Sequence, residues 1–138
     1  MVVDYCHPDL LPDKFLIMQE VIKVETKTEI FTPEECFITE ILNVEDFRSF
    51  SIAKARVLPG ITTRNHKLNE TDEVYYILEG KGEMEINGKN LGTAKKGDAV
   101  FIPKNANQRI TNSGNDDLVF LCICAPRFEP GNYQADNN

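Results

Sequence analysis

Seven short apolar segments, separated by turn residues, follow one another through most of this 138-residue chain. They are rich in Val, Ile, Phe and Tyr, and their lengths are those of β-strands. Between two of them, the pair Asn87-Gly88 favours a tight hairpin, because both central positions of that turn need positive φ. Many short strands at near-regular spacing, with little helix, predict an all-β sandwich or barrel. The strands are expected at residues 36–42, 50–58, 73–78, 83–86, 99–102, 108–111 and 118–124.

The length of the chain fits one domain with one hydrophobic core. Residues 1–14 carry three Asp and two Pro, and they predict an irregular N-terminal arm. The barrel domain is expected over residues 15–128, although the pattern from 15 to 31 leaves both helix and strand open. After Phe128 the apolar pattern is lost, so residues 129–138 are expected to form a C-terminal tail.

Charge and composition restrict the partners of the chain. A net charge of −7 argues against nucleic acid and against anionic membrane surfaces, because phosphate binding needs accumulated Lys and Arg. There is no apolar run long enough for a membrane span and no secretion signal at the N-terminus, which predicts a cytoplasmic protein. In that compartment the four cysteines are expected to be reduced.

The cysteines offer little chemistry on their own. Cys122 and Cys124 share one face of an apolar strand, where small hydrophobic residues of a sheet are the plainer interpretation than a redox or metal role. The adjacent pair Cys6-His7 near the N-terminus is not expected to form a site by itself.

Strand alternation predicts which side chains share a face. Small residues on the face of Ala53, Ala55 and Val57 would leave space for a ligand if that face points inward, and Lys54 and Arg56 would then point out. The other sets that share a face are Arg64, His66 and Leu68; Glu73, Tyr75 and Ile77; and Gln108, Ile110 and Asn112. If these faces line a barrel, they bring an imidazole, a carboxylate, a phenol and a carboxamide together.

The spacing of glycine, histidine and glutamate around this region resembles the first motif of the cupin family. Gly60, His66, Glu73 and Gly80 stand at the positions of that motif, and Leu68 takes the place of its second histidine. The family's fold is a double-stranded β-helix, or jelly-roll barrel, so the resemblance implies this architecture for the chain.

The second cupin motif is also present in altered form. Gly97, Pro103 and Asn112 match it, whereas Asn105 replaces its glycine and Gln108 replaces its histidine. The two motifs together place the resemblance at about residues 50–126. Cupins include enzymes, sensors and storage proteins, so the resemblance does not fix the reaction.

Typical cupins hold a metal through the motif histidines and glutamate. Carried over to this chain, the implied ligands are His66 and Glu73, with the Gln108 amide oxygen as a weaker third. The resemblance therefore implies a weakly held divalent ion, such as Fe, Mn, Zn or Ni. The plainer alternative for His66 is a hydrogen-bonded residue of the barrel wall.

Without a metal, the same residues suggest acid–base chemistry. Burial would raise the pKa of Glu73, which together with His66 and the Tyr75 hydroxyl would form a catalytic set. Tyr75 could instead be an aromatic core residue. Arg64 is expected to grip a substrate carboxylate or phosphate, unless it is a solvated surface residue. Substrate binding is thus assigned to Arg64, Gln108 and Tyr75.

The sequence predicts a small single-domain cupin that binds a small polar or anionic metabolite in its barrel. One alternative is a metal-free isomerase or epimerase acting on a sugar or carbonyl compound, and another is a non-catalytic metabolite sensor. A homodimer is expected, because a second copy would cover the exposed faces and edges of so small a barrel.

Overall fold

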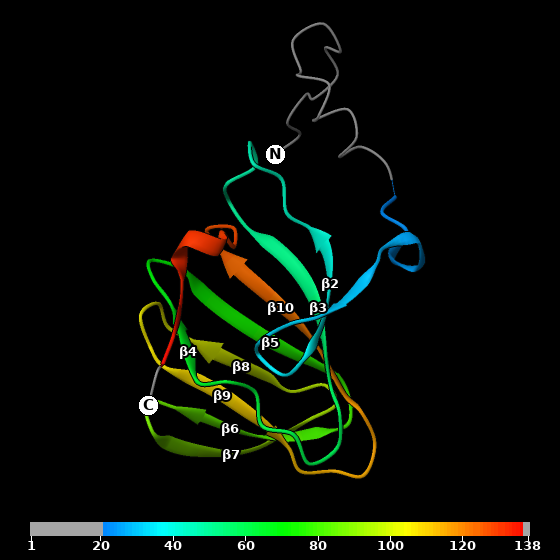
Figure 1. The fold of residues 1–138 in the computed structure, drawn as a ribbon, viewed down its shortest axis with the longest axis vertical. Helices are drawn as coiled ribbons and strands as arrows, with labels where there is room; N and C mark the ends of the chain where they lie inside the picture. Colours follow the sequence, from blue (N-terminus) through cyan, green and yellow to red (C-terminus); the bar gives the residue numbers. More distant parts are fainter. Residues whose placement is uncertain (1–20, 137–138) are drawn as a thin grey trace, which may run out of the picture.

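The computed structural model describes residues 21–136 and consists almost entirely of β-strands (Figure 1). Two short 3₁₀ turns, η2 (Val24–Thr26) and η3 (Pro130–Asn132), are the helical elements of these residues. The strands are β1 (Glu29–Phe31), β2 (Phe37–Leu42), β3 (Ser51–Val57), β4 (His66–Leu68), β5 (Asp72–Glu79), β6 (Lys81–Ile86), β7 (Lys89–Lys95), β8 (Ala99–Ile102), β9 (Gln108–Asn112), β10 (Leu118–Ala125) and β11 (Tyr133–Ala135).

The strands form two antiparallel sheets. One sheet has six strands in the order β1-β2-β3-β10-β5-β8, and the other has five in the order β11-β4-β9-β6-β7. A single cluster of buried residues draws members from both sheets, including Ile77 and Phe120 from the first and Met84 and Ile110 from the second. The inner faces of the two sheets therefore pack against each other, which confirms the predicted all-β, double-stranded β-helix barrel.

Alternation along the strands separates the inner face from the outer one. On β3, Ala55 and Val57 are almost fully buried, and Arg56 points outward to pair with Glu29 and Asp117. On β9, Gln108, Ile110 and Asn112 are all buried, as the sequence predicts. The cluster of inward-facing side chains on β3, β5, β9 and β10 therefore forms one interior.

Two turns show why particular residues are needed there. Asn87 and Gly88, with φ of 51° and 79°, connect β6 to β7, which confirms the predicted hairpin. Gly80, with φ of 78°, lies so close to the loop between β9 and β10 that a Cβ would be 2.6 Å from the Asp117 carbonyl oxygen. The chain can therefore pass from β5 in one sheet to β6 in the other only with glycine at this position.

The C-terminal tail adds a strand to the five-stranded sheet. β11 pairs antiparallel with β4, placing Tyr133 opposite Leu68 and Ala135 opposite His66. The Asp136 amide donates to the Asn65 carbonyl oxygen and extends this pairing. The sheet thus includes a strand from beyond the predicted domain limit at residue 128. The predicted arm at 1–14 and the pair Cys6-His7 lie outside the described residues.

The outer face of the six-stranded sheet is apolar and partly uncovered. Phe101 and Tyr76 are 60% and 42% exposed, and Val74 pairs with both Phe101 and Ile123 across neighbouring strands. The predicted homodimer would have an apolar surface available here and remains a prediction. Within residues 21–136, no helix is long and apolar enough to span a membrane.

Candidate functional site

A cavity of about 200 Å³ lies in the barrel and is lined by both polar and apolar side chains. Its walls include Ala53 and Ala55, so the small residues of β3 do leave space beside Phe120, as the sequence suggests. The polar residues and thiols that line it are Thr32, Glu34, Cys36, Glu40, Asn43, Ser51, Thr63, His66, Glu73, Tyr75, Cys122 and Cys124.

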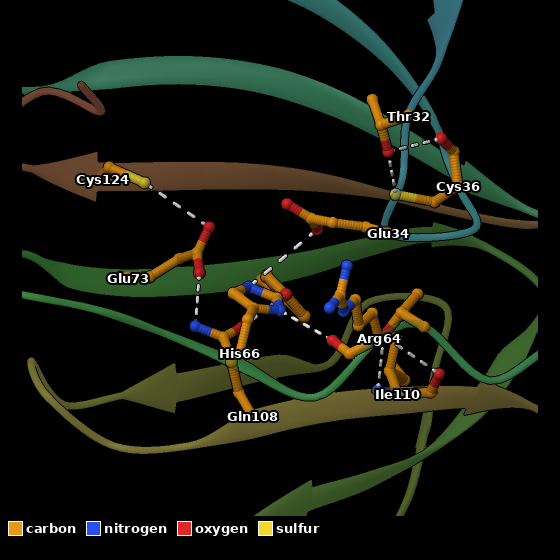
Figure 2. A network of polar contacts seen from close by, with 11 residues as sticks. Thr32, Glu34, Cys36, Arg64, His66, Glu73, Gln108, Ile110 and Cys124 are labelled. Carbon is orange, nitrogen blue, oxygen red and sulfur yellow. Dashed lines mark hydrogen bonds and ion pairs between the residues drawn. The ribbon is translucent and has the colours of Figure 1, made fainter. Parts of the chain in front are cut away.

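His66, the first residue of β4, presents one ring nitrogen to the backbone and the other to the cavity. Its Nδ1 lies 2.9 Å from the Arg64 carbonyl oxygen, which can only accept, so Nδ1 carries the proton in this arrangement. Its Nε2 lies 4.0 Å from Glu34 Oε2, too far for a hydrogen bond (Figure 2). Tyr133 stacks on the ring, with a centroid separation of 5.0 Å. The imidazole is thus buried and held in one orientation.

Glu73 is buried on β5 and accepts two hydrogen bonds. Gln108 Nε2 donates to one carboxylate oxygen at 2.9 Å, and Cys124 Sγ donates to the other at 3.4 Å (Figure 2). Burial raises the pKa of Glu73, while the bond from Gln108 and the nearby His66 oppose that rise. Ionising this carboxyl group therefore costs free energy, and each of its oxygens already has a hydrogen-bond partner.

Tyr75, in the cavity wall, and Gln108, behind it, complete this network. The Tyr75 hydroxyl donates to Gln108 Oε1 at 2.6 Å, and the ring packs on Phe120 at 4.3 Å between centroids. Burial raises the pKa of Tyr75 well above its usual value. Gln108 is 1% exposed and does not line the cavity. The hydrogen bonds therefore run in one direction, from Tyr75 through Gln108 to Glu73, because the two partners fix the orientation of the Gln108 amide.

Glu34 is the site residue that the sequence does not reveal. It lies in the loop between β1 and β2, where the Arg64 amide donates to its backbone carbonyl oxygen at 3.0 Å. Burial raises the pKa of its carboxyl group, and His66 opposite it acts in the other direction. In the sequence this residue stands in a turn of four residues starting at Thr32, where no periodicity indicates an inward side chain.

Arg64 does not lie where the strand pattern places it. β4 begins only at His66, and the irregular backbone before it breaks the alternation. Thr63 is buried and lines the cavity, whereas Arg64 is exposed and is not among the lining residues. Arg64 is therefore outside the cavity wall, and its role in gripping an anionic substrate remains a prediction. Its positive charge acts instead on Tyr133, whose pKa burial raises to about 12.

Three thiols line the cavity. Cys36, Cys122 and Cys124 are free, which agrees with the expected reduced state for these three. Burial raises the pKa of Cys36 to about 12 and raises those of Cys122 and Cys124 still further above the usual range for thiols. They therefore remain protonated at neutral pH and behave as small, weakly polar wall residues.

The ligand set implied by the resemblance does not fit a metal in this arrangement. The Gln108 amide oxygen already accepts the Tyr75 hydroxyl proton, and its nitrogen points at Glu73. Across residues 21–136, no group of three or more His, Cys, Asp or Glu side chains is placed to hold a metal ion. His66 Nε2 and Glu34 form a two-donor pair at most.

An antiparallel two-sheet barrel with a partly polar interior defines the class of this protein as a double-stranded β-helix protein. The cupin domain family matches residues 53–124, which is more than half of the chain. The chain therefore belongs to the cupin family.

The chain is also similar to two other proteins. It is 33% identical over 117 residues to the uncharacterized protein MJ1618 of Methanocaldococcus jannaschii, covering 82% of this chain and 93% of that relative. It is 38% identical over 71 residues to an oxalate-binding protein of Thermotoga maritima, covering 51% of this chain and 58% of that one.

Among solved structures, a predicted oxalate decarboxylase from Thermotoga maritima superposes with a TM-score of 0.70 at 27% identity, covering 78% of this chain and 99% of that one. The nucleoside dehydratase Pac13 superposes with a TM-score of 0.71 at 16% identity, covering 85% and 90%, which shows the shared fold alone.

Proposed function

We propose that this cupin binds a small polar or anionic organic molecule in its barrel cavity and exchanges a proton with it through His66. The observation that carries the proposal is the orientation of the imidazole. Its Nδ1 is committed to the Arg64 carbonyl oxygen, and its Nε2 is left facing the cavity, 4.0 Å from Glu34. A ligand atom that bridges Nε2 and the Glu34 carboxylate would complete the hydrogen bonding of both groups.

This geometry supports metal-free acid–base chemistry with His66 as the base. A neutral imidazole can take a proton from an acidic C–H or O–H group through Nε2, and the Glu34 carboxylate would stabilise the imidazolium that forms. Glu73 and Tyr75 fit a supporting role better than a proton-transfer role, since their polar atoms are engaged with Gln108 and Cys124. In this proposal they are positioning residues, and the reaction class is isomerisation or epimerisation next to a carbonyl group.

The relatives support an organic ligand in the barrel. The oxalate-binding protein and the predicted oxalate decarboxylase of Thermotoga maritima are both named for a small carboxylic acid. These names make a compact organic molecule the natural starting point for a search.

The test begins with a thermal-shift screen of the purified chain against sugars, sugar acids and small carbonyl compounds. Each ligand found is then incubated in D₂O, and proton NMR measures the exchange of its C–H groups with solvent. We expect exchange or conversion with the wild type and its loss in His66→Gln, with Arg109→Gln as the control at a surface residue outside the cavity. Exchange that survives in His66→Gln would refute the assignment of the base. Tight binding with no exchange or conversion would favour the sensor alternative.

The predicted divalent ion has its own measurement. Elemental analysis of untagged protein quantifies iron, manganese, zinc and nickel per chain, before and after replacement of His66 by Gln. A stoichiometric metal that His66→Gln abolishes would assign Nε2 to coordination instead of proton transfer.

A further inference from the structure

From the polar groups that face the cavity, we infer that its ligand is an uncharged or positively charged hydrogen-bond donor and not a dicarboxylate. This inference rests on the proposed function, because it concerns the ligand of the same cavity, and it narrows that ligand from polar or anionic molecules to those without negative charge. It separates this chain from the relative named for oxalate, which is a dianion.

The charged residues of the cavity wall are predominantly acidic. Glu34, Glu40 and Glu73 line it together with His66, and no Lys or Arg is among the lining residues of the described chain. Arg64, the cation that the sequence suggested for gripping an anion, is exposed. A dianion in this cavity would lie among these acidic groups without a guanidinium or ammonium partner, and burying an unpaired charge is strongly unfavourable.

The donors around the cavity are largely used within the protein. The Tyr75 hydroxyl donates to Gln108, and the Cys124 thiol donates to Glu73. The Thr32 hydroxyl donates to the Cys36 carbonyl oxygen. The Asn43 amide nitrogen donates to the Phe128 carbonyl oxygen.

The groups left for a ligand are acceptors. His66 Nε2 belongs to a side chain that is 4% exposed, and it has its lone pair toward Glu34 in the neutral ring. The Glu34 carboxylate makes no side-chain hydrogen bond among the described residues, and its 4.0 Å contact with His66 leaves acceptor positions free on both sides. A hydroxyl, amide N–H or ammonium group on the ligand satisfies these acceptors, and a carboxylate cannot.

Apolar surface completes the recognition. Ala53, Ala55 and Phe120 line the same cavity, so the donor group of the ligand would sit on a compact apolar body. Glu34 is accordingly the residue that sets charge selectivity, because it faces the base across the space where the donor would lie.

Four probes of nearly equal size and different charge test this inference: malonate, malonamate, malonamide and 3-aminopropanamide. Affinities are measured by ¹H–¹⁵N NMR titration of the full chain, followed at Glu34, His66 and Glu73, with and without EDTA. We expect malonamide and 3-aminopropanamide to bind at least about tenfold more tightly than malonate. Glu34→Gln should reduce that preference by about tenfold, and Arg109→Gln, at a surface residue that does not line the cavity, should leave it unchanged.

The outcomes separate the inference from the proposed function. Preferential binding of malonate in the cavity overturns the inference and leaves a ligand-binding barrel intact. A malonate preference that EDTA abolishes also overturns it, because a metal would then be the anion receptor. A loss of malonate binding in Arg64→Gln would return the anion-gripping role to that residue. If none of the probes perturbs the cavity residues at tens of millimolar, both the inference and the proposed function fail.

Discussion

Replacement of Gln108 by Leu removes the centre of the buried polar row while keeping a side chain of similar size. In the wild type Gln108 accepts from the Tyr75 hydroxyl at 2.6 Å and donates to the Glu73 carboxylate at 2.9 Å. The variant leaves two buried polar groups short of a partner, and one of them is a carboxyl group. Each such group costs roughly 1–3 kcal/mol, and more when charged, so we expect a loss of about 3–5 kcal/mol in the free energy of unfolding. For a domain of this size that corresponds to a melting temperature lower by roughly 10–20 °C.

Urea denaturation measures this loss, and a double-mutant cycle with Tyr75→Phe assigns it to the network. Tyr75→Phe alone should cost about 1–3 kcal/mol, because the Gln108 oxygen is then unsatisfied. In the Gln108→Leu background the same change should cost almost nothing, giving a coupling of roughly 1–3 kcal/mol. Arg109→Gln is the matched control, since this exposed neighbour on β9 pairs with Glu85 at the surface and should change stability by less than about 1 kcal/mol.

The reasoning about the network is refuted by either of two results. One is a loss below about 1 kcal/mol in Gln108→Leu, which would mean that Tyr75 and Glu73 find other partners. The other is an equal cost of Tyr75→Phe in both backgrounds, which would mean that the hydroxyl does not depend on Gln108.

Three further predictions concern other parts of the molecule. Burial raises the pKa of Glu73 in the folded state. The free energy of unfolding of the wild type, relative to that of Glu73→Gln, should therefore increase as pH falls through the raised pKa, by at most about 1.4 kcal/mol per pH unit, and level off below the unfolded pKa. Parallel pH profiles of the two proteins, measured by denaturation at pH 4–8, would contradict this. Gly82→Ala should lower the free energy of unfolding by about 1–3 kcal/mol, because the new Cβ would lie 2.8–3.0 Å from side-chain atoms of Leu118 and Ile110. Gly131→Ala is the control, since Gly131 has open space around it and the change should be nearly neutral in the same urea assay. If the predicted homodimer uses the apolar outer face of the six-stranded sheet, Phe101→Lys should shift the mass measured by light scattering from dimer to monomer; a dimer that persists would assign the interface elsewhere.

Local alternation predicts much of the barrel interior. Glu73, Tyr75 and Gln108 are buried and linked as their strand positions suggest, because β5 and β9 are regular over those residues. The Asn87-Gly88 hairpin is readable for the same reason, since the turn geometry depends on two adjacent residues. β7 is harder to delimit from the sequence, because most of its residues are exposed and show no apolar alternation.

The partners of His66 could not be predicted from the sequence. Glu34 faces the His66 ring from the loop between β1 and β2, about thirty residues earlier in the chain. Tyr133 stacks on the same ring from the C-terminal strand β11. Parity does not assign Arg64 to a face, because it holds only within an unbroken strand and β4 starts two residues later. Contacts made by loops and by added edge strands are set by tertiary packing, which leaves no periodic signal.

The orientation of the His66 ring is the claim on which the proposed proton transfer depends most. ¹⁵N NMR of the imidazole nitrogens, with His7→Gln to assign the two histidines, determines which nitrogen carries the proton in the neutral ring. We predict that His66 is protonated on Nδ1, with an unprotonated Nε2 whose signal shifts in Glu34→Gln. A neutral ring protonated on Nε2 would contradict the account, because the nitrogen that faces the cavity would then be a donor and not a base.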